Sequence, residues 1–325
     1  MQRVVVRTIG GPEQLTVETA SEPLRPGPGQ LLVEVEAAGV NFLDVQQRRG
    51  TSKVPLPHPL GLEGVGRVCE VGDGVDGSAG LLALGCRVSW FDVRGSYASH
   101  LLVPAARAIP VPDSFSVGQA LIFQALTAQY LATEYRSISP GDRVLVHSAA
   151  GGVGQLLIQW LKHLGAWVVG TVSTDAKANI ARSAGADAVI NYGRDYSFAD
   201  AVQSLTAGKG VDLVFDSVGE ATLKASLKSL ARGGTVVSFG FASGHPHEFD
   251  PRDLIVPCTR LAGGSVFSYN AEPAELQRRA AAVIGAIEAG WLRPSAGTAY
   301  PLARVADAHR DIEGRSTDGK LYLVP

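Results

Sequence analysis

A glycine-rich turn in the middle of the chain has the composition of a phosphate-binding loop. An apolar run over 144–147 leads into the turn SAAGGVG, and a helix-length segment follows over 155–164. Ala149 stands where the G-x-G-x-x-G pattern has its first glycine, while Gly151 and Gly154 keep their places. A strand, a turn and a helix in this order direct backbone N–H groups and the positive helix end toward a pyrophosphate. The pattern predicts a dinucleotide site; the alternative is that the glycines serve only close packing of strand and helix.

The residues after the next strand bear on which dinucleotide is bound. An NAD site usually places an acid at the end of this strand, where it binds the ribose 2′-hydroxyl. The strand predicted over 167–172 ends before Asp175, which falls in the first turn of a helix, where an acid stabilises the helix dipole. Ser173, Thr174 and Lys177 instead offer hydroxyls and a cation to a 2′-phosphate. This favours NADPH, although Lys177 could equally be a solvated helix residue.

The elements that position this loop alternate along the second part of the chain. Short apolar strands are separated by helix-length segments, which is typical of a parallel, doubly wound sheet. We therefore predict an α/β fold with a Rossmann domain over 121–269. Its strands are expected over 144–147, 167–172, 188–190, 211–216, 235–239 and 265–268.

The first part of the chain reads differently. Short strands bounded by Gly or Pro are expected over 31–37, 64–71 and 97–103, which predicts a mainly antiparallel β domain. After residue 270 no further βα series follows; a helix over 274–289 and strands over 299–302 and 321–324 are expected instead. We expect this tail to return to the first domain. The predicted domains are thus 1–120 with 270–325, and 121–269.

Composition limits the classes of function. A length of 325 residues suits two domains, and 46% hydrophobic with 18% charged residues suits a globular protein. A net charge of −2 leaves no basic excess for nucleic acid or an anionic membrane surface. The three cysteines form no CxxC pair, and no long apolar segment opens the chain. We expect a cytoplasmic protein without nucleic-acid or membrane partners.

Further motifs stand along nearly the whole chain. They are Asn41-Phe42-Leu43-Asp44 with Arg48 and Gly50, Gly61-Leu62-Glu63-Gly64, Gly95-Ser96-Tyr97-Ala98, Asp216-Ser217-Val218-Gly219, Ser238-Phe239-Gly240, and Arg315 before Gly319-Lys320. With these motifs and the glycine-rich loop, the sequence resembles the zinc-free quinone oxidoreductase branch of the medium-chain dehydrogenase/reductases, which includes zeta-crystallin. The resemblance implies a GroES-like, mainly antiparallel β domain beside the Rossmann domain, NADPH as cofactor, and an active site in the cleft.

The resemblance also implies roles for individual residues. Asn41 is expected to face the nicotinamide and the substrate as a catalytic residue, with Thr127 near the ring. The substrate pocket is expected to include Asp44, Gln46 and Phe241. The cofactor-binding residues are expected to be Ala150, Gly151, Gly152, Val153, Gly154, Ser173, Thr174, Lys177, Tyr192, Ser217, Phe239, Gly240, Phe267 and Arg315. The alternatives are turn capping for Asn41 and Asp44, and core packing for the two phenylalanines.

The residues present do not suit zinc, which related alcohol dehydrogenases bind. The segment 41–44 stands where the family has its first Cys ligand, and Leu62 takes the place of a His before Glu63. Two carboxylates without imidazole or thiolate make a poor zinc site, so we expect no metal. His147 is expected in the core, and the loop over 245–248 at the surface. The chain departs from the family in carrying Gln46 where several relatives have Tyr, in a longer loop over 75–85, and in Cys86 for a common Asp.

These observations predict an NADPH-dependent, zinc-independent oxidoreductase that transfers hydride to a quinone or to the β-carbon of an α,β-unsaturated carbonyl. Two alternatives remain open: an enoyl-thioester reductase of a biosynthetic pathway, and a non-catalytic, crystallin-like NADPH-binding protein. The resemblance implies a homodimer formed by the last strand of the Rossmann sheet, expected near 265–268.

Overall fold

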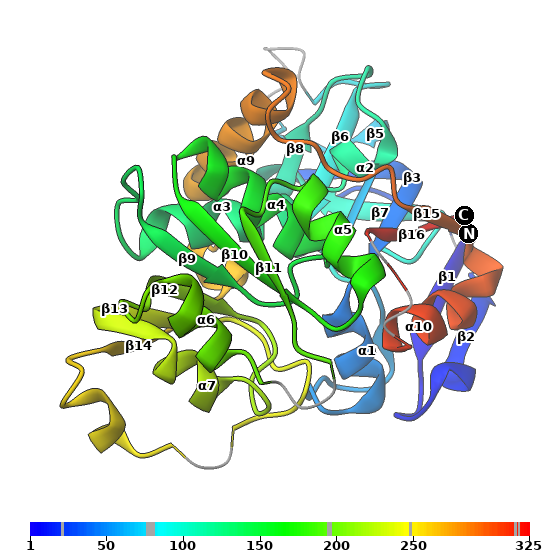
Figure 1. The fold of residues 1–325 in the computed structure, drawn as a ribbon. Helices are drawn as coiled ribbons and strands as arrows, with labels where there is room; N and C mark the ends of the chain where they lie inside the picture. The colour runs from blue at the N-terminus through cyan, green and yellow to red at the C-terminus, as the bar shows by residue number, and fades with distance from the viewer. Residues whose placement is uncertain (21–22, 76–81, 194–196, 247–248, 315–316, 318) are drawn as a thin grey trace. The chain divides into compact units, whose positions relative to one another are not determined.

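A computed structural model describes the chain except for residues 21–22, 76–81, 194–196, 247–248, 315–316 and 318 (Figure 1). Two compact units make up the chain. Unit 1 comprises Met1–Phe123, Asn270–Gly285 and Pro294–Pro325, and unit 2 comprises Gln124–Tyr269 and Ala286–Arg293. The sequence placed all of 270–325 with the first domain, whereas Ala286–Arg293 groups with unit 2. Within unit 2, the ring of Trp291 in this segment stacks on that of His163 with 3.9 Å between centroids.

Unit 1 is built on antiparallel β-structure. A seven-stranded sheet has the order β15-β16-β3-β5-β6-β8, with β7 also paired to β3, and a small sheet has the order β2-β1-β4. The strands are β1 (Gln2–Val6), β2 (Leu15–Thr19), β3 (Gln30–Val40), β4 (His58–Pro59), β5 (Glu63–Val71), β6 (Arg87–Phe91), β7 (His100–Pro104), β8 (Ala108–Pro110), β15 (Thr298–Pro301) and β16 (Leu321–Val324). The helices are η1 (Pro12–Gln14), α1 (Phe42–Arg49), η2 (Ala105–Arg107), α2 (Val117–Ala120), α9 (Pro273–Glu288, which runs on into unit 2), η4 (Leu302–Arg304) and α10 (Val305–Glu313).

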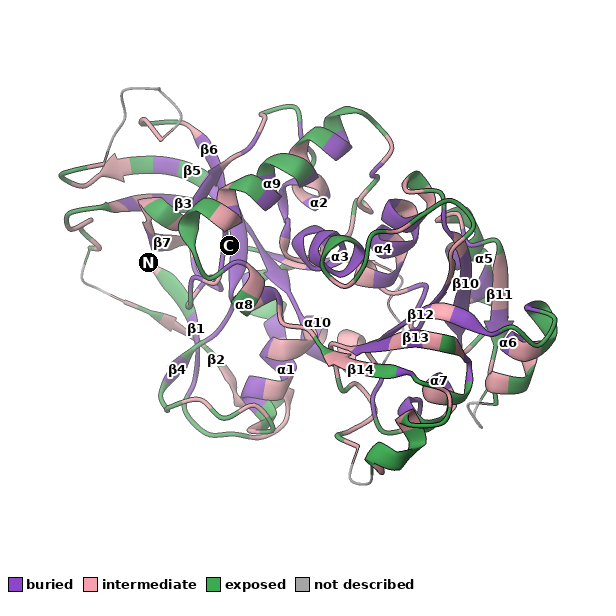
Figure 2. Ribbon diagram, turned by 90° about the vertical axis from the view of Figure 1, so that its left-hand side faces the viewer, coloured by how far each residue is buried: buried purple, intermediate pink, exposed green. Residues whose placement is uncertain are grey.

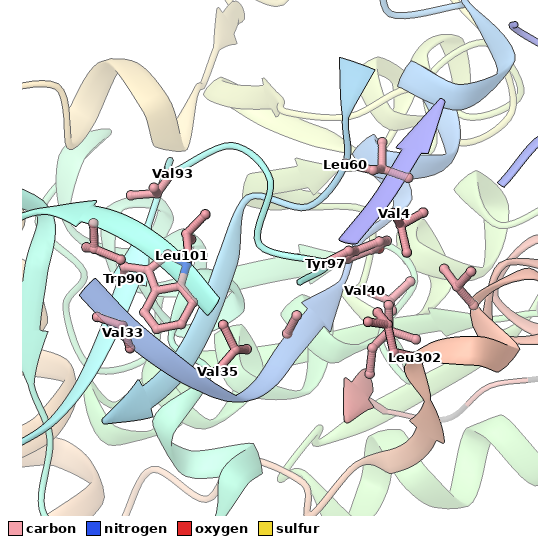
Figure 3. Close-up of a cluster of buried hydrophobic side chains, with 14 of the residues drawn as sticks. Val4, Val33, Val35, Val40, Leu60, Trp90, Val93, Tyr97, Leu101 and Leu302 are labelled. Atoms are coloured by element: carbon pink, nitrogen blue, oxygen red, sulfur yellow. The ribbon is translucent and has the colours of Figure 1, made fainter. Parts of the chain in front are cut away.

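The core of unit 1 follows from the alternation of side chains along β3. Val33 and Val35 are buried while Glu34, between them, is exposed, as expected for a strand with one face toward the core. Figure 3 shows Val33 and Val35 in the same cluster as Trp90 and Tyr97. Tyr97 therefore brings a phenolic hydroxyl into an otherwise apolar core, and a buried hydroxyl requires a hydrogen-bond partner.

Unit 2 contains a six-stranded parallel sheet in the order β11-β10-β9-β12-β13-β14. This is the order of a doubly wound dinucleotide-binding sheet, whose direction of winding reverses beside β9. The strands are β9 (Arg143–Val146), β10 (Trp167–Val172), β11 (Ala188–Asn191), β12 (Val211–Asp216), β13 (Leu230–Ser238) and β14 (Arg260–Gly263). The helices are α3 (Phe123–Glu134, whose first residue belongs to unit 1), α4 (Gly152–His163), α5 (Asp175–Ser183), α6 (Ala199–Leu205), α7 (Leu223–Lys228), η3 (Pro251–Leu254) and α8 (Val266–Tyr269).

Neighbouring residues of β10 show that helices cover both faces of this sheet. Val169 belongs to a core cluster that includes Val202 of α6 and Leu223 of α7. The next residue, Gly170, faces the opposite side, where a Cβ would lie 3.6 Å from the Cβ of Ala181 in α5. Figure 2 shows β10 largely buried, as expected for a strand covered on both faces, whereas the edge strands β11 and β14 are mostly intermediate or exposed. The predicted fold class is confirmed.

One predicted strand is wrong. Residues 265–268 were expected to form the last strand of the parallel sheet, but α8 covers Val266–Tyr269. The last strand is β14, Arg260–Gly263, which pairs with β13 in the register Thr235 with Arg260. Among the described residues, no helix is both long and apolar enough to span a membrane.

Candidate active site

The end of β3 places Asn41 at the head of helix α1. The strand ends at Val40 and the helix begins at Phe42, so Asn41 occupies the position before the first helical residue. The carboxylate of Asp44 accepts a hydrogen bond from the backbone N–H of Asn41 at 2.8 Å, which satisfies a donor at the helix start. Asp44 thereby fixes the backbone from which the Asn41 side chain projects.

The side-chain amide of Asn41 lies between two opposite charges. Its Nδ2 donates to Oε1 of Glu63 at 2.9 Å, and its Oδ1 accepts from Nζ of Lys320 at 3.0 Å. Lys320 and Glu63 also form an ion pair with each other. The side chain of Glu63 has no exposed surface and that of Lys320 is 3% exposed. The three residues form one buried polar cluster, which we call the Asn41 cluster.

The register of three adjacent strands brings the Asn41 cluster together. Strand β3 is flanked by β16 and β5, with Leu321 opposite Val40 and Gly64 opposite Ala38. Lys320 and Glu63 are the residues just before these two partners, so both lie beside the end of β3.

Gly39 gives the charged groups of this cluster the space they occupy. A Cβ at Gly39 would lie 2.3 Å from Oε1 of Glu63 and 2.7 Å from Cε of Lys320. Any side chain at position 39 would therefore displace the ion pair.

Beneath Asn41, a second set of buried groups surrounds Asp44. The hydroxyl of Tyr97 donates to Oδ2 of Asp44 at 2.9 Å and lies 3.3 Å from Nε2 of His309. Burial raises the pKa of Asp44 to about 7, against the opposing effect of its hydrogen bonds with Asn41 and Tyr97. Burial lowers the pKa of His309 to about 3, with the nearby Arg48 as a smaller cause. Asp44 is thus a wholly buried carboxyl that supports Asn41 from below.

In unit 2, the glycine-rich loop has the close approaches that its sequence predicts. Ser148 has a φ of 52°, and a Cβ on Gly154 would lie 2.3 Å from the backbone oxygen of Ser148. A Cβ on Gly152 would lie 2.2 Å from Oε1 of Gln124. Gly151 is the N-cap of α4, so the first N–H groups of a three-turn helix are directed to the loop. This arrangement can hold a pyrophosphate.

A buried network fixes the loop after β12. Oδ1 of Asp216 accepts the backbone N–H groups of Val218 and Gly219 at 2.8 and 3.0 Å, and Oδ2 accepts from the hydroxyl of Ser226 at 2.9 Å. His147 lies 2.9 Å from the same hydroxyl. Burial lowers the pKa of His147, and the expected place of this residue in the core is confirmed. The network holds the loop that contains Ser217.

The residues expected around a 2′-phosphate gather after β10 and β11. Thr174 caps α5, its hydroxyl accepting from the backbone N–H of Lys177 at 3.3 Å. The side chain of Asn191, the residue before Tyr192, donates a hydrogen bond to Asp175 at 2.8 Å. This contact joins the start of α5 to the end of β11. Ser173 directly follows β10. Arg315 lies outside the described residues.

The remaining predicted residues divide between the units. Gln46 is half-buried on α1 in unit 1, whereas Thr127 is buried on α3 in unit 2. The ring of Phe241 is 37% exposed and packs on His245. Phe239 and Gly240 follow β13, and Phe267 lies in α8. Residues 247–248, part of the loop expected at the surface, are outside the described residues.

Sequence reasoning missed the roles of Glu63 and Lys320. Both residues stand in motifs that the sequence shows, but 257 positions separate them. In the sequence, the cluster is marked only by a glycine at 39, an acid at 63 and a lysine before the final strand. None of these residues indicates by itself that it contacts the others. Only the pairing of β16, β3 and β5 shows that these residues meet.

The donors of the Asn41 cluster do not fit a zinc ion. Leu62, in the position expected of a histidine ligand, is apolar and 3% exposed. The ammonium of Lys320 already neutralises Glu63 and contacts Asn41. A cation at these groups would meet the charge of Lys320, and no imidazole or thiolate stands with them. Within the described ranges no group of three or more His, Cys, Asp or Glu residues could hold a metal.

Comparisons with known proteins agree with this arrangement. The family model of the alcohol dehydrogenase GroES-like domain matches residues 27–113, and that of zinc-binding dehydrogenases matches residues 152–282. A 2-haloacrylate reductase of a Burkholderia species is 36% identical over 340 residues, covering 99% of this chain and 98% of the relative. A quinone oxidoreductase of Pseudomonas aeruginosa is 35% identical over 335 residues, covering 100% and 99%.

Solved structures give the same picture. The Escherichia coli quinone oxidoreductase complexed with NADPH is 35% identical, covers 100% of both chains and has a TM-score of 0.94. A mycobacterial protein complexed with NADPH is 40% identical over 100% of both chains, with a TM-score of 0.95. The chain therefore belongs to the zeta-crystallin-like quinone oxidoreductase branch of the medium-chain dehydrogenase/reductase superfamily.

Proposed function

We propose that the protein is an NADPH-dependent oxidoreductase that transfers hydride to a quinone or to the β-carbon of an α,β-unsaturated carbonyl, without a metal. The observation that carries this proposal is the Asn41 cluster, in which a neutral amide is held between charges where a zinc site would need imidazole or thiolate. The full-length similarity to quinone oxidoreductases and to a 2-haloacrylate reductase supports both classes of acceptor.

The cofactor would be held by the ends of the parallel strands. The loop of Ala150, Gly151, Gly152, Val153 and Gly154 would bind the pyrophosphate at the start of α4. The 2′-phosphate would meet Ser173, Thr174, Lys177 and Tyr192. The nicotinamide half would meet Ser217, Phe239, Gly240 and Phe267. When bound, NADPH supplies hydride from C4 of its nicotinamide. That two of the similar structures hold NADPH supports this choice.

The chain's own part in the chemistry is to stabilise charge on the acceptor oxygen. As hydride reaches a conjugated carbon, negative charge develops on that oxygen, and a preorganised donor lowers the barrier. Asn41 offers an amide N–H for this purpose, and Thr127 offers a hydroxyl. Solvent would supply the proton. Gln46 and Phe241 would line the pocket of a flat, conjugated substrate, with Asp44 supporting Asn41 from beneath.

The quaternary structure that fits this family is a homodimer built on the edge of the parallel sheet. Strand β14 is the last strand of the sheet and is partly exposed. The segment before it exposes Ile255 by 68% and Val256 by 88%. An open sheet edge beside exposed apolar side chains favours pairing with a second copy. We also propose that the protein acts in the cytoplasm, where its three free cysteines would stay reduced.

A panel of acceptors tests the proposed activity. The purified protein is incubated with NADPH, or with NADH, and with quinones, enones, 2-haloacrylates and enoyl thioesters, and nicotinamide absorbance is followed. We expect oxidation of NADPH with quinones or enones, and a clear preference over NADH. Turnover of enoyl thioesters alone would favour the biosynthetic reductase. Tight binding of NADPH without oxidation by any acceptor would favour the crystallin-like role.

A further inference from the structure

We propose that Lys320 and Glu63 are positioning residues for the reaction: together they fix the orientation of the Asn41 amide, so that its second N–H is presented to the acceptor oxygen. This inference rests on the role given to Asn41 under the proposed function. It adds two residues that do not themselves contact the acceptor.

The orientation of the amide follows from the chemistry of its neighbours. An ammonium can only donate hydrogen bonds and a carboxylate can only accept them. Lys320 therefore requires the amide oxygen on its side, and Glu63 requires the amide nitrogen. Turning the amide by 180° would place N–H groups against the ammonium and the carbonyl against the carboxylate, which loses both hydrogen bonds. Either charge alone favours the observed orientation of the Asn41 amide. Together, the two charges exclude the flipped orientation.

One donor then remains for the acceptor. The Nδ2 atom carries two hydrogens, of which one is used by Glu63 at 2.9 Å. Within the described part of the chain, the other hydrogen has no partner. Donation by Lys320 to Oδ1 withdraws electron density from the amide, which strengthens the remaining N–H as a donor. The ion pair thus orients and polarises the group proposed to stabilise the developing oxyanion.

The carboxylate is itself held on its far side. Oε2 of Glu63 accepts the backbone N–H of Phe123, the first residue of α3, at 3.1 Å. With Oε1 shared between Lys320 and Asn41, both oxygens are engaged, so Glu63 cannot rotate away from the amide. A buried ion pair is weak evidence for a contribution to stability alone, because desolvation offsets the attraction. Orienting the Asn41 amide is a role for this ion pair that does not depend on its contribution to stability.

The test compares Lys320→Met with Asn41→Ala and with the double variant. We expect Lys320→Met to lower kcat on the order of tenfold, less than the ~10²-fold loss for removing a preorganised donor, with Kd for NADPH unchanged. In the Asn41→Ala background the same substitution should change kcat by no more than about twofold, because residues that act through one another are not additive. Lys320→Arg, which keeps a cationic donor, should recover part of the lost activity.

A second ion pair of unit 1, whose arginine is buried, provides the control. Arg87, whose side chain is 4% exposed, pairs with Glu36 at 2.8 Å. Arg87→Met should lower the midpoint of thermal unfolding without lowering kcat, which separates a loss of stability from a loss of orientation.

The outcomes separate this inference from the proposed function. If Lys320→Met lowers kcat by the same factor with and without Asn41, the pair does not act through the amide and the inference is wrong. If Asn41→Ala leaves kcat unchanged with every acceptor, the role of Asn41 itself fails. If Lys320→Met leaves kcat unchanged while Asn41→Ala lowers it, only the positioning role is lost.

Discussion

The fold changes the ionisation of the buried side chain of Asp44. Burial raises its pKa to about 7, well above the ordinary value of 3.8. The folded protein therefore binds this proton more tightly than the unfolded chain does. The stabilisation is complete below pH about 4 and is lost as the pH rises through about 7.

Asp44→Asn tests this assignment, since an amide keeps the shape but does not titrate. We expect the free energy of unfolding of the wild type, taken relative to the variant, to fall as the pH is raised from about 4 to about 8. His309, whose pKa burial lowers to about 3, destabilises the fold as the pH falls, but it does so in both proteins and cancels in the difference. Chemical denaturation at several pH values measures this quantity, and a difference that does not vary with pH would show that Asp44 is ionised throughout.

Among the elements, the start of α5 is the one proposed to select NADPH over NADH. Lys177 lies in the first turn of this helix, and Thr174 caps it. Lys177→Ala should weaken NADPH binding by about 10 to 150-fold, which corresponds to roughly 1.5–3 kcal/mol for a charge-assisted contact, and leave NADH nearly unchanged. Titration of both nucleotides by fluorescence measures the two affinities. Lys224→Ala, at an exposed position in α7, is the control and should affect neither; equal losses for NADPH and NADH in the Lys177 variant would refute the contact.

Two segments of unit 2 show which strands the local sequence can predict. Strand β10 has the bounds expected from its apolar run, 167–172, because a strand covered on both faces has a continuous apolar signal. The segment 265–268 has the same aromatic and β-branched character but forms part of a helix. The true edge strand, Arg260–Gly263, is partly exposed and has no such signal. Its identity comes from pairing with β13, which no local window contains.

For the whole molecule, sequence reasoning predicted the two-domain α/β fold, but it nominated only Asn41, of the three residues in the Asn41 cluster, as a catalytic group. Asn41 could be nominated because its motif is local. Glu63 and Lys320 could not, since their meeting depends on the register of three strands drawn from both ends of unit 1. The grouping of Ala286–Arg293 with unit 2 likewise involves contacts between residues far apart in the sequence, such as the stacking of Trp291 on His163.

The exposed edge of β14 predicts the oligomeric state. Light scattering at several concentrations should give the mass of a homodimer, twice the 34.0 kDa of the chain. Val256→Asp, which places a charge at an 88% exposed apolar position beside the edge, should weaken the dimer because the charge would be desolvated on association. A wild type that remains a monomer at all concentrations would contradict the proposal.

In the proposed reaction, hydride goes to a conjugated carbon while neutral donors stabilise the oxygen. The direct measurement uses an enone and NADPH deuterated at the transferred C4 position, with the product analysed by NMR. We expect deuterium on the β-carbon of a saturated ketone whose carbonyl is intact. An allylic alcohol with deuterium on the carbonyl carbon would instead show direct carbonyl reduction, as in an alcohol dehydrogenase, and would contradict the proposed reaction.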